Sequence, residues 1–239
     1  MRSYYKDLTI LCLEIPWVDG LKTQEGYEPH ASVAPFLSAF SVSYGCGFIH
    51  RNVYSADDLL RWTEHAKSAP LGKKILWIAG HGVGGSDTHA CLTLPRRRGD
   101  EKTERFDLLK PEVVGRALSA AGGIEGVVIS SCCFGRNAPE TWLAGVDANW
   151  AIGFTKELFW SDALFFCMKT LEWLYEGEEI TSSNAAKERF LGCVSRGGVR
   201  NRDDAVQYDA WAMGLGTKFF YRAQRKGWTS VDFNSAGTP

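Results

Sequence analysis

Short apolar runs alternate along this chain with segments of helical periodicity, and this alternation constrains the fold more than any other feature. Continuous runs of strand length occupy residues 8–15, 74–79 and 126–131. Apolar residues at helical spacing follow these runs, most clearly in residues 111–121 and 161–175. Strands that are buried on both faces and joined through helices form parallel sheets with right-handed crossovers. The sequence therefore predicts an α/β fold in which a mostly parallel sheet is sandwiched by helices in three layers.

A single domain is expected over residues 1–239, because 45% of the chain is hydrophobic and no internal repeat or interdomain linker interrupts it. The last fifty or so residues carry no recognisable motif. Less regular patterns complete the expected elements: strands at 47–54 and 149–155, a hairpin around 90–94, and helices at 33–40, 56–69, 139–144 and 184–191.

The composition excludes several classes of protein. The net charge of -1 gives no electrostatic footprint for nucleic acid or a membrane surface. No apolar run reaches the about 20 residues that span a bilayer, and the first apolar stretch is interrupted by Glu14 and lacks a signal-peptide cleavage site. Seven cysteines without a CxxC pair predict neither a disulfide framework nor a metal site. We expect a cytoplasmic protein with no cofactor, whose partners are neither nucleic acid nor membrane.

One apolar run ends in a histidine between two glycines. Residues 74–79 lead into Gly80-His81-Gly82, where the chain leaves the sheet. The glycines let the backbone turn sharply and let a substrate approach closely, and the amide of Gly82 is then available to an oxyanion. His81 is a candidate general base, although a histidine in a glycine-rich turn is as often a hydrogen-bonded loop residue.

A second apolar run ends in a pair of cysteines. Residues 126–131 lead directly into Cys132-Cys133-Phe134-Gly135. A helix N-terminus or a cation near a thiol at the lip of a strand lowers its pKa, which makes Cys132 a candidate nucleophile. The alternative is a structural cysteine, because free cysteine is among the most buried residue types. We expect one thiol of the pair to face the cleft and the other to lie in the core.

The two strand ends gain meaning from their spacing. His81 lies about fifty residues before Cys132, with one strand-helix-strand crossover between them. In parallel sheets reactive groups gather beyond the carboxyl ends of the strands, so we expect the two ends to be neighbours. A thiolate that attacks a peptide carbonyl needs a base within hydrogen-bond reach and donors for the oxyanion. Cys132, His81 and the amides of Gly82 and Cys132 form such a set.

The segments ILWIAGHG (75–82) and VVISSCCFG (127–135) resemble the signature of the caspase–gingipain–separase clan of cysteine peptidases, and within it the CHAT family. That family typically has Ser-Ala-Cys-x-x-Gly at its nucleophile; here Ser131 replaces the alanine and Gly135 keeps the glycine. Residues 143–166 resemble the family's next strand and helix. The resemblance covers roughly residues 70–175 and implies a caspase-hemoglobinase-like fold.

The resemblance also implies roles for individual residues. Cys132 would be the nucleophile and His81 the base, with no third catalytic residue required. Ser130 matches a position that lines the substrate pocket in relatives, and because it is not acidic it does not indicate cleavage after Lys or Arg. The residues implied to bind substrate are Ser130, Thr155, Lys156 and Glu157, of which the last three read equally well as a solvated loop.

We therefore expect a cysteine endopeptidase that cleaves a protein or peptide substrate through a thioester acyl-enzyme. The resemblance implies control by a separate regulatory protein partner, in a bacterial antiviral defence or cell-death system. Two alternatives stay open. One is a catalytically silent pseudopeptidase that acts as a binding or scaffold protein, and the other is an acyltransferase that uses the same Cys–His pair.

Overall fold

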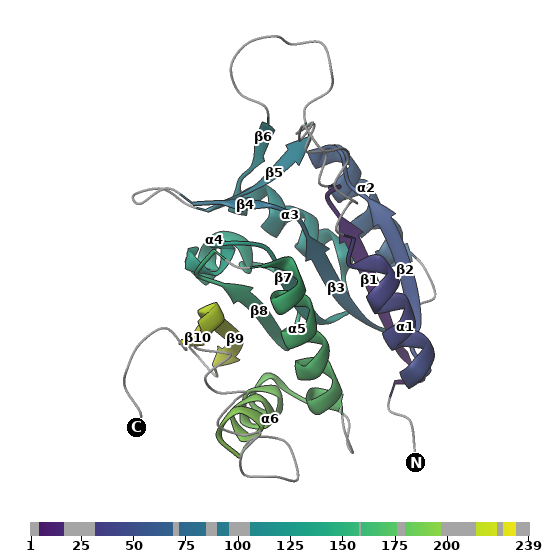
Figure 1. Cartoon of the computed structure of the whole chain (residues 1–239), viewed down its shortest axis with the longest axis vertical. Helices are drawn as coiled ribbons and strands as arrows, with labels where there is room; N and C mark the ends of the chain where they lie inside the picture. Colours follow the sequence, from purple (N-terminus) through teal and green to yellow (C-terminus); the bar gives the residue numbers. More distant parts are fainter. Residues whose placement is uncertain are drawn as a thin grey trace, which may run out of the picture.

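A computed structural model describes residues 5–16, 32–68, 72–84, 90–95, 106–157, 159–175, 180–196, 214–223 and 227–232. Seven of its strands form a central sheet in the order β10-β9-β8-β7-β3-β1-β2 (Figure 1). The five strands from β2 to β8 in this order are parallel, and β9 and β10 are antiparallel. The strands of the sheet are β1 (Leu8–Glu14), β2 (Gly47–Asn52), β3 (Lys73–Ala79), β7 (Ile124–Ser130), β8 (Trp150–Phe154), β9 (Thr217–Ala223) and β10 (Gly227–Asp232).

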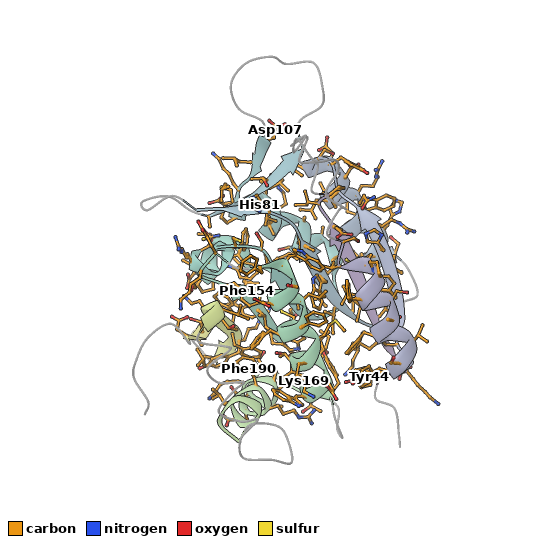
Figure 2. All side chains as sticks on the ribbon, viewed as in Figure 1. Tyr44, His81, Asp107, Phe154, Lys169 and Phe190 are labelled. Atoms are coloured by element: carbon orange, nitrogen blue, oxygen red, sulfur yellow. The ribbon has the colours of Figure 1, made fainter. Side chains whose placement is uncertain are left out.

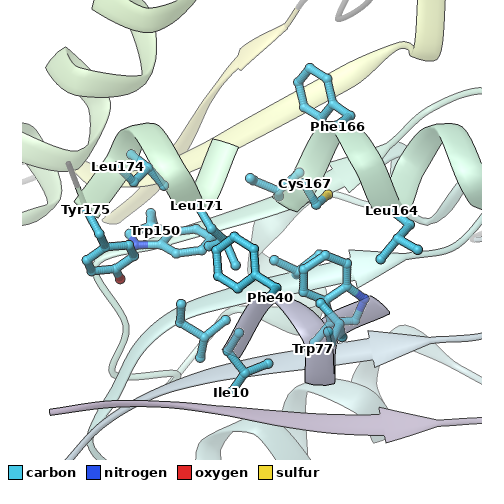
Figure 3. Packing of buried hydrophobic residues seen from close by; sticks show 14 of the residues in the cluster. Ile10, Phe40, Trp77, Trp150, Leu164, Phe166, Cys167, Leu171, Leu174 and Tyr175 are labelled. Carbon is cyan, nitrogen blue, oxygen red and sulfur yellow. The ribbon is translucent and has the colours of Figure 1, made fainter. Parts of the chain in front are cut away.

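Helices cover both faces of this sheet and confirm the predicted three-layer α/β architecture. One hydrophobic core lies between the sheet and α1, α5 and α6, and a second lies between the sheet and α2, α3 and α4. In the first core, Trp77 and Trp150 of the sheet pack beside Phe40 of α1 and Leu164 and Leu171 of α5 (Figure 3). The helices are α1 (Ala34–Tyr44), α2 (Ala56–Ser68), α3 (Pro111–Ala121), α4 (Pro139–Trp142), α5 (Trp160–Tyr175) and α6 (Ser183–Arg196).

A small antiparallel sheet follows β3 and lies beyond the carboxyl end of the central sheet (Figure 1). It is formed by β4 (Gly82–Val83), β5 (Cys91–Pro95) and β6 (Phe106–Leu109). The hairpin expected around residues 90–94 corresponds to the β5 part of this sheet. Because β4 begins at Gly82, the small sheet directly continues the turn that contains His81.

The C-terminal strands are the part of the fold that the sequence patterns did not predict. β9 inserts beside β8, and β10 pairs with β9 at the edge of the sheet. Phe219 and Phe220 of β9 are both fully buried, one in each core. The chain therefore completes its central sheet with residues beyond the last predicted helix.

Several element boundaries differ from the predicted ones by a few residues. β7 begins at Ile124 rather than at Gly126, so Gly126 lies inside the strand. A Cβ at position 126 would collide with the ring of Trp150, which explains why the residue is a glycine. β2 ends at Asn52 and α4 at Trp142, each two residues earlier than predicted. Among the described helices, none is long and apolar enough to cross a membrane.

Candidate active site

The ends of β3 and β7 lie side by side, because the two strands are parallel neighbours in the sheet. Ala79, the last residue of β3, pairs with Ser130, the last residue of β7. The amide of Gly80 donates a hydrogen bond to the carbonyl of Ser130 at 3.4 Å. His81 and Cys132 each follow this pair by two residues. The structure thus brings the two predicted strand ends together at the carboxyl end of the sheet.

Gly82 brings the histidine turn into direct contact with the cysteine turn. A Cβ at position 82 would lie 3.0 Å from the carbonyl carbon of Cys132 and would collide with its carbonyl oxygen and with the hydroxyl of Ser131. Only glycine fits this approach without displacing one of the two turns. The Ser131 hydroxyl is buried and makes no hydrogen bond to a described residue, so it adds no bond that an alanine there would lack.

The small sheet holds the backbone of His81. Its carbonyl accepts hydrogen bonds from the amide of Thr93 at 2.9 Å and from the Thr93 hydroxyl at 3.2 Å. In an antiparallel ladder, this bond makes Gly82 and Leu92 a non-hydrogen-bonded pair, so the amide of Gly82 points away from β5. His81 itself is half-buried, and Figure 2 shows it where the chain passes from β3 to the small sheet.

The two adjacent cysteines lie in different environments. Cys132 is half-buried, whereas Cys133 is only 3% exposed. Burial raises the pKa of the Cys133 thiol, an effect that the charge of Arg136 partly opposes, so this thiol is a poor nucleophile at neutral pH. Cys133 has a left-handed backbone with φ of 61°, and its amide donates to the carbonyl of Lys156 at 3.1 Å. This conformation separates the directions of the two side chains.

Gly135 fits the turn after the cysteines closely against β8. A Cβ at this position would lie 2.7 Å from the amide nitrogen of Phe154 and 2.8 Å from the carbonyl carbon of Gly153. Close packing against β8 therefore explains why position 135 is a glycine in this chain. It lets the backbone of the cysteine turn pass directly over the end of β8.

The predicted pocket residues fall into a buried group and an exposed group. Ser130 and Thr155 are 7% and 8% exposed, and the Thr155 hydroxyl donates to the carbonyl of Gly216 at 3.0 Å. Lys156 and Glu157 are exposed. The carbonyl of Lys156 accepts the hydrogen bond from the amide of Cys133, so the structure places this segment beside the cysteine turn.

Asn137 is a residue of this region that the sequence analysis did not identify. Its side chain is 2% exposed and accepts a hydrogen bond from the amide of Ala90 at 3.0 Å. Its Nδ2 atom donates to the carbonyl of Ala90 at 2.8 Å and to that of Phe134 at 2.9 Å. A lone asparagine between Arg136 and a helix N-terminus gives no signal for such contacts, because Ala90 is distant in sequence.

Comparisons with known proteins find similarity to solved structures alone. No protein-family model and no curated protein match the chain, so CHAT remains a resemblance. One similar solved structure is that of a secreted C11 cysteine protease from Bacteroides thetaiotaomicron in complex with an irreversible peptide inhibitor. The identity is 14% and the TM-score 0.46, and the match covers 91% of this chain and 66% of that chain, just under two thirds. At these values the likeness says nothing about the reaction of this chain.

Proposed function

We propose that this chain is a cysteine endopeptidase in which Cys132 is the nucleophile and His81 the general base. The observation that carries the proposal is the close approach of the Gly82 backbone to the Cys132 carbonyl, which brings the histidine turn next to the cysteine turn. Cys132 is also more exposed than its neighbour Cys133, which agrees with the expectation that one thiol of the pair faces the cleft and the other lies in the core.

In the proposed reaction, His81 accepts the Sγ proton of Cys132 while the sulfur attacks the carbonyl carbon of the scissile peptide. The amides of Gly82 and Cys132 donate hydrogen bonds to the developing oxyanion, and the Gly82 amide suits this role because it points away from β5. The protonated His81 then gives its proton to the leaving amine, and the C–N bond breaks to leave a thioester. Water attacks the thioester, His81 takes up its proton, and the carboxylate product leaves as the thiol re-forms.

Residues at the carboxyl ends of β7 and β8 supply the proposed substrate pocket. Lys156 and Glu157 are exposed, and we assign them to the rim that contacts a protein or peptide substrate. Ser130, the last residue of β7, and Thr155 are buried, and we assign them to the wall of the pocket. The Thr155 hydroxyl is bonded to the carbonyl of Gly216, which fixes its position. An unrestrained endopeptidase would damage other proteins of a cytoplasm, so the proposal includes control by a separate protein partner.

Thiol reactivity tests the proposed dyad without a known substrate. The native protein is treated with limiting iodoacetamide at mildly acidic pH, and the modified cysteines are mapped by mass spectrometry. Cys132 should react first, and His81→Ala should slow it by about 100-fold, whereas the exposed His65→Ala serves as a matched control and should not. Cys46 and Cys167 are internal references, because burial raises the pKa of Cys46 to about 11 and that of Cys167 still further.

A peptide library gives the corresponding test of turnover. Cys132→Ala should abolish cleavage and leave the thermal unfolding transition in place, and cleavage that persists in this variant would refute the assignment. If Cys132 reacts no faster than Cys46, the chain is either a pseudopeptidase or a peptidase held inactive until its partner binds. If the acyl group passes to an added amine in preference to water, the chain is an acyltransferase.

A further inference from the structure

The side chain of Asn137 joins two segments that the proposed reaction must hold together. Its amide group acts on both polar groups of Ala90, as a neighbouring strand would, and also on the carbonyl of Phe134. Phe134 lies two residues after Cys132, and Ala90 immediately precedes β5. Asn137 thus bridges the cysteine turn and the small sheet with three buried hydrogen bonds.

The bridge continues through β5 to the histidine turn. Three residues after Ala90, Thr93 donates both its amide and its hydroxyl to the carbonyl of His81. Thr93 is 4% exposed, and the bond from its hydroxyl to His81 is partly buried. A continuous path of hydrogen bonds and one short strand therefore runs from the cysteine turn through Asn137 and Thr93 to His81.

Beyond the hydrogen bond between Gly80 and Ser130, direct packing alone would let the two turns separate. The Gly82 contact prevents the turns from approaching further, but a steric contact does not prevent them from separating. Hydrogen bonds that span the gap oppose separation, and buried amide groups bonded at every position resist rearrangement because a lost partner leaves a buried polar group unsatisfied. Asn137 provides this restraint.

We propose that Asn137 is a positioning residue that keeps His81 within reach of Cys132, an inference that rests on the proposed Cys132–His81 dyad. It touches neither the substrate nor the reacting atoms and acts through Ala90 and Thr93. The expected signature is a loss of Cys132 reactivity that depends on the presence of His81.

A double-mutant cycle on the alkylation rate of Cys132 tests this dependence. Asn137→Ala should slow the reaction of Cys132 with iodoacetamide by about tenfold or more. In the His81→Ala background, Asn137→Ala should change the rate by less than about twofold, because the residue it positions is gone. The side chain of Asn149 bonds Glu125 at the amino ends of β7 and β8, far from the candidate site. Asn149→Ala is therefore the matched control, and it should leave the rate unchanged.

A second variant covers the case in which Asn137→Ala does not fold, as judged by its thermal transition. Thr93→Val keeps the shape of the side chain and the backbone bond to His81 but removes the hydroxyl bond. It should slow Cys132 by a few-fold, again only when His81 is present. The proposal is overturned if the variants slow Cys132 equally with and without His81, or leave its rate within twofold of wild type. If His81→Ala itself has no effect, the dyad fails first, and that single arm identifies the failure.

Discussion

Replacing Gly82 by alanine should separate the two turns of the candidate site. The new Cβ would lie 3.0 Å from the Cys132 carbonyl carbon and closer still to its oxygen, where an ordinary contact begins at 3.4 Å. Both neighbouring atoms belong to the backbone, so no flexible side chain can move aside, and the histidine turn must shift by on the order of 1 Å. A misplacement of this size costs about 100-fold in the rate of a reaction that depends on geometry, while the strain lowers the free energy of unfolding by about 1–3 kcal/mol.

The Gly82→Ala prediction is measured as the rate of Cys132 alkylation, together with urea unfolding to follow stability. Gly80→Ala is the matched control on the other side of His81, because the three atoms nearest to its Cβ all belong to the side chain of Ile15, at 3.0 Å and beyond. Gly80→Ala should have a clearly smaller effect on the rate. A Gly82→Ala protein that alkylates Cys132 within twofold of the wild-type rate, or a Gly80→Ala protein that is equally impaired, would refute the reasoning.

The remaining predictions concern stability. Burial raises the pKa of the Cys46 thiol from its ordinary value of 9.0 to about 11, so between these pH values the unfolded chain ionises first and the free energy of unfolding should fall; urea titrations should show a shallower fall in Cys46→Ala, and an unchanged slope would contradict this. Lys74 is 5% exposed and donates to the carbonyls of Ala66 at 3.0 Å and Ala121 at 3.5 Å, so Lys74→Met should cost about 1–3 kcal/mol. The exposed Lys67 at the end of α2 gives the matched control Lys67→Met, which should cost less than about 1 kcal/mol in the same assay.

The central parallel strands could be predicted because their sequence signal is local. β1 and β3 are buried on both faces, so each reads as a continuous apolar run rather than as an alternating pattern. The position of the candidate residues at the carboxyl ends of the strands follows from topology, since parallel strands joined by crossovers all end on the same end of the sheet. These two regularities were enough to predict that the strand ends before His81 and Cys132 are neighbours, and the pairing of β3 with β7 confirms it.

The parts that could not be predicted depend on partners distant in sequence. Asn137 and Lys74 act through backbone carbonyls of other elements, and no spacing in the chain announces such bonds. A lysine at the start of a strand reads as a solvent-exposed residue, yet Lys74 lies at the ends of two helices whose C-terminal carbonyls attract a cation. β9 and β10 follow one another along the chain and join the sheet by antiparallel pairing, so they lack the strand-then-helix pattern that revealed the other strands.

The bond between Thr155 and Gly216 has a consequence for how this protein is made. The amide and hydroxyl of Thr155 both donate to the carbonyl of Gly216, and β9 follows directly. A ribosome releases His81, Cys132 and Thr155 well before it releases this segment, and a domain folds as a unit once its chain is available. The segment beside the cysteine turn is therefore completed only after Gly216 has left the ribosome. A nascent chain would carry His81 and Cys132 past neighbouring proteins while the candidate site was still unfinished.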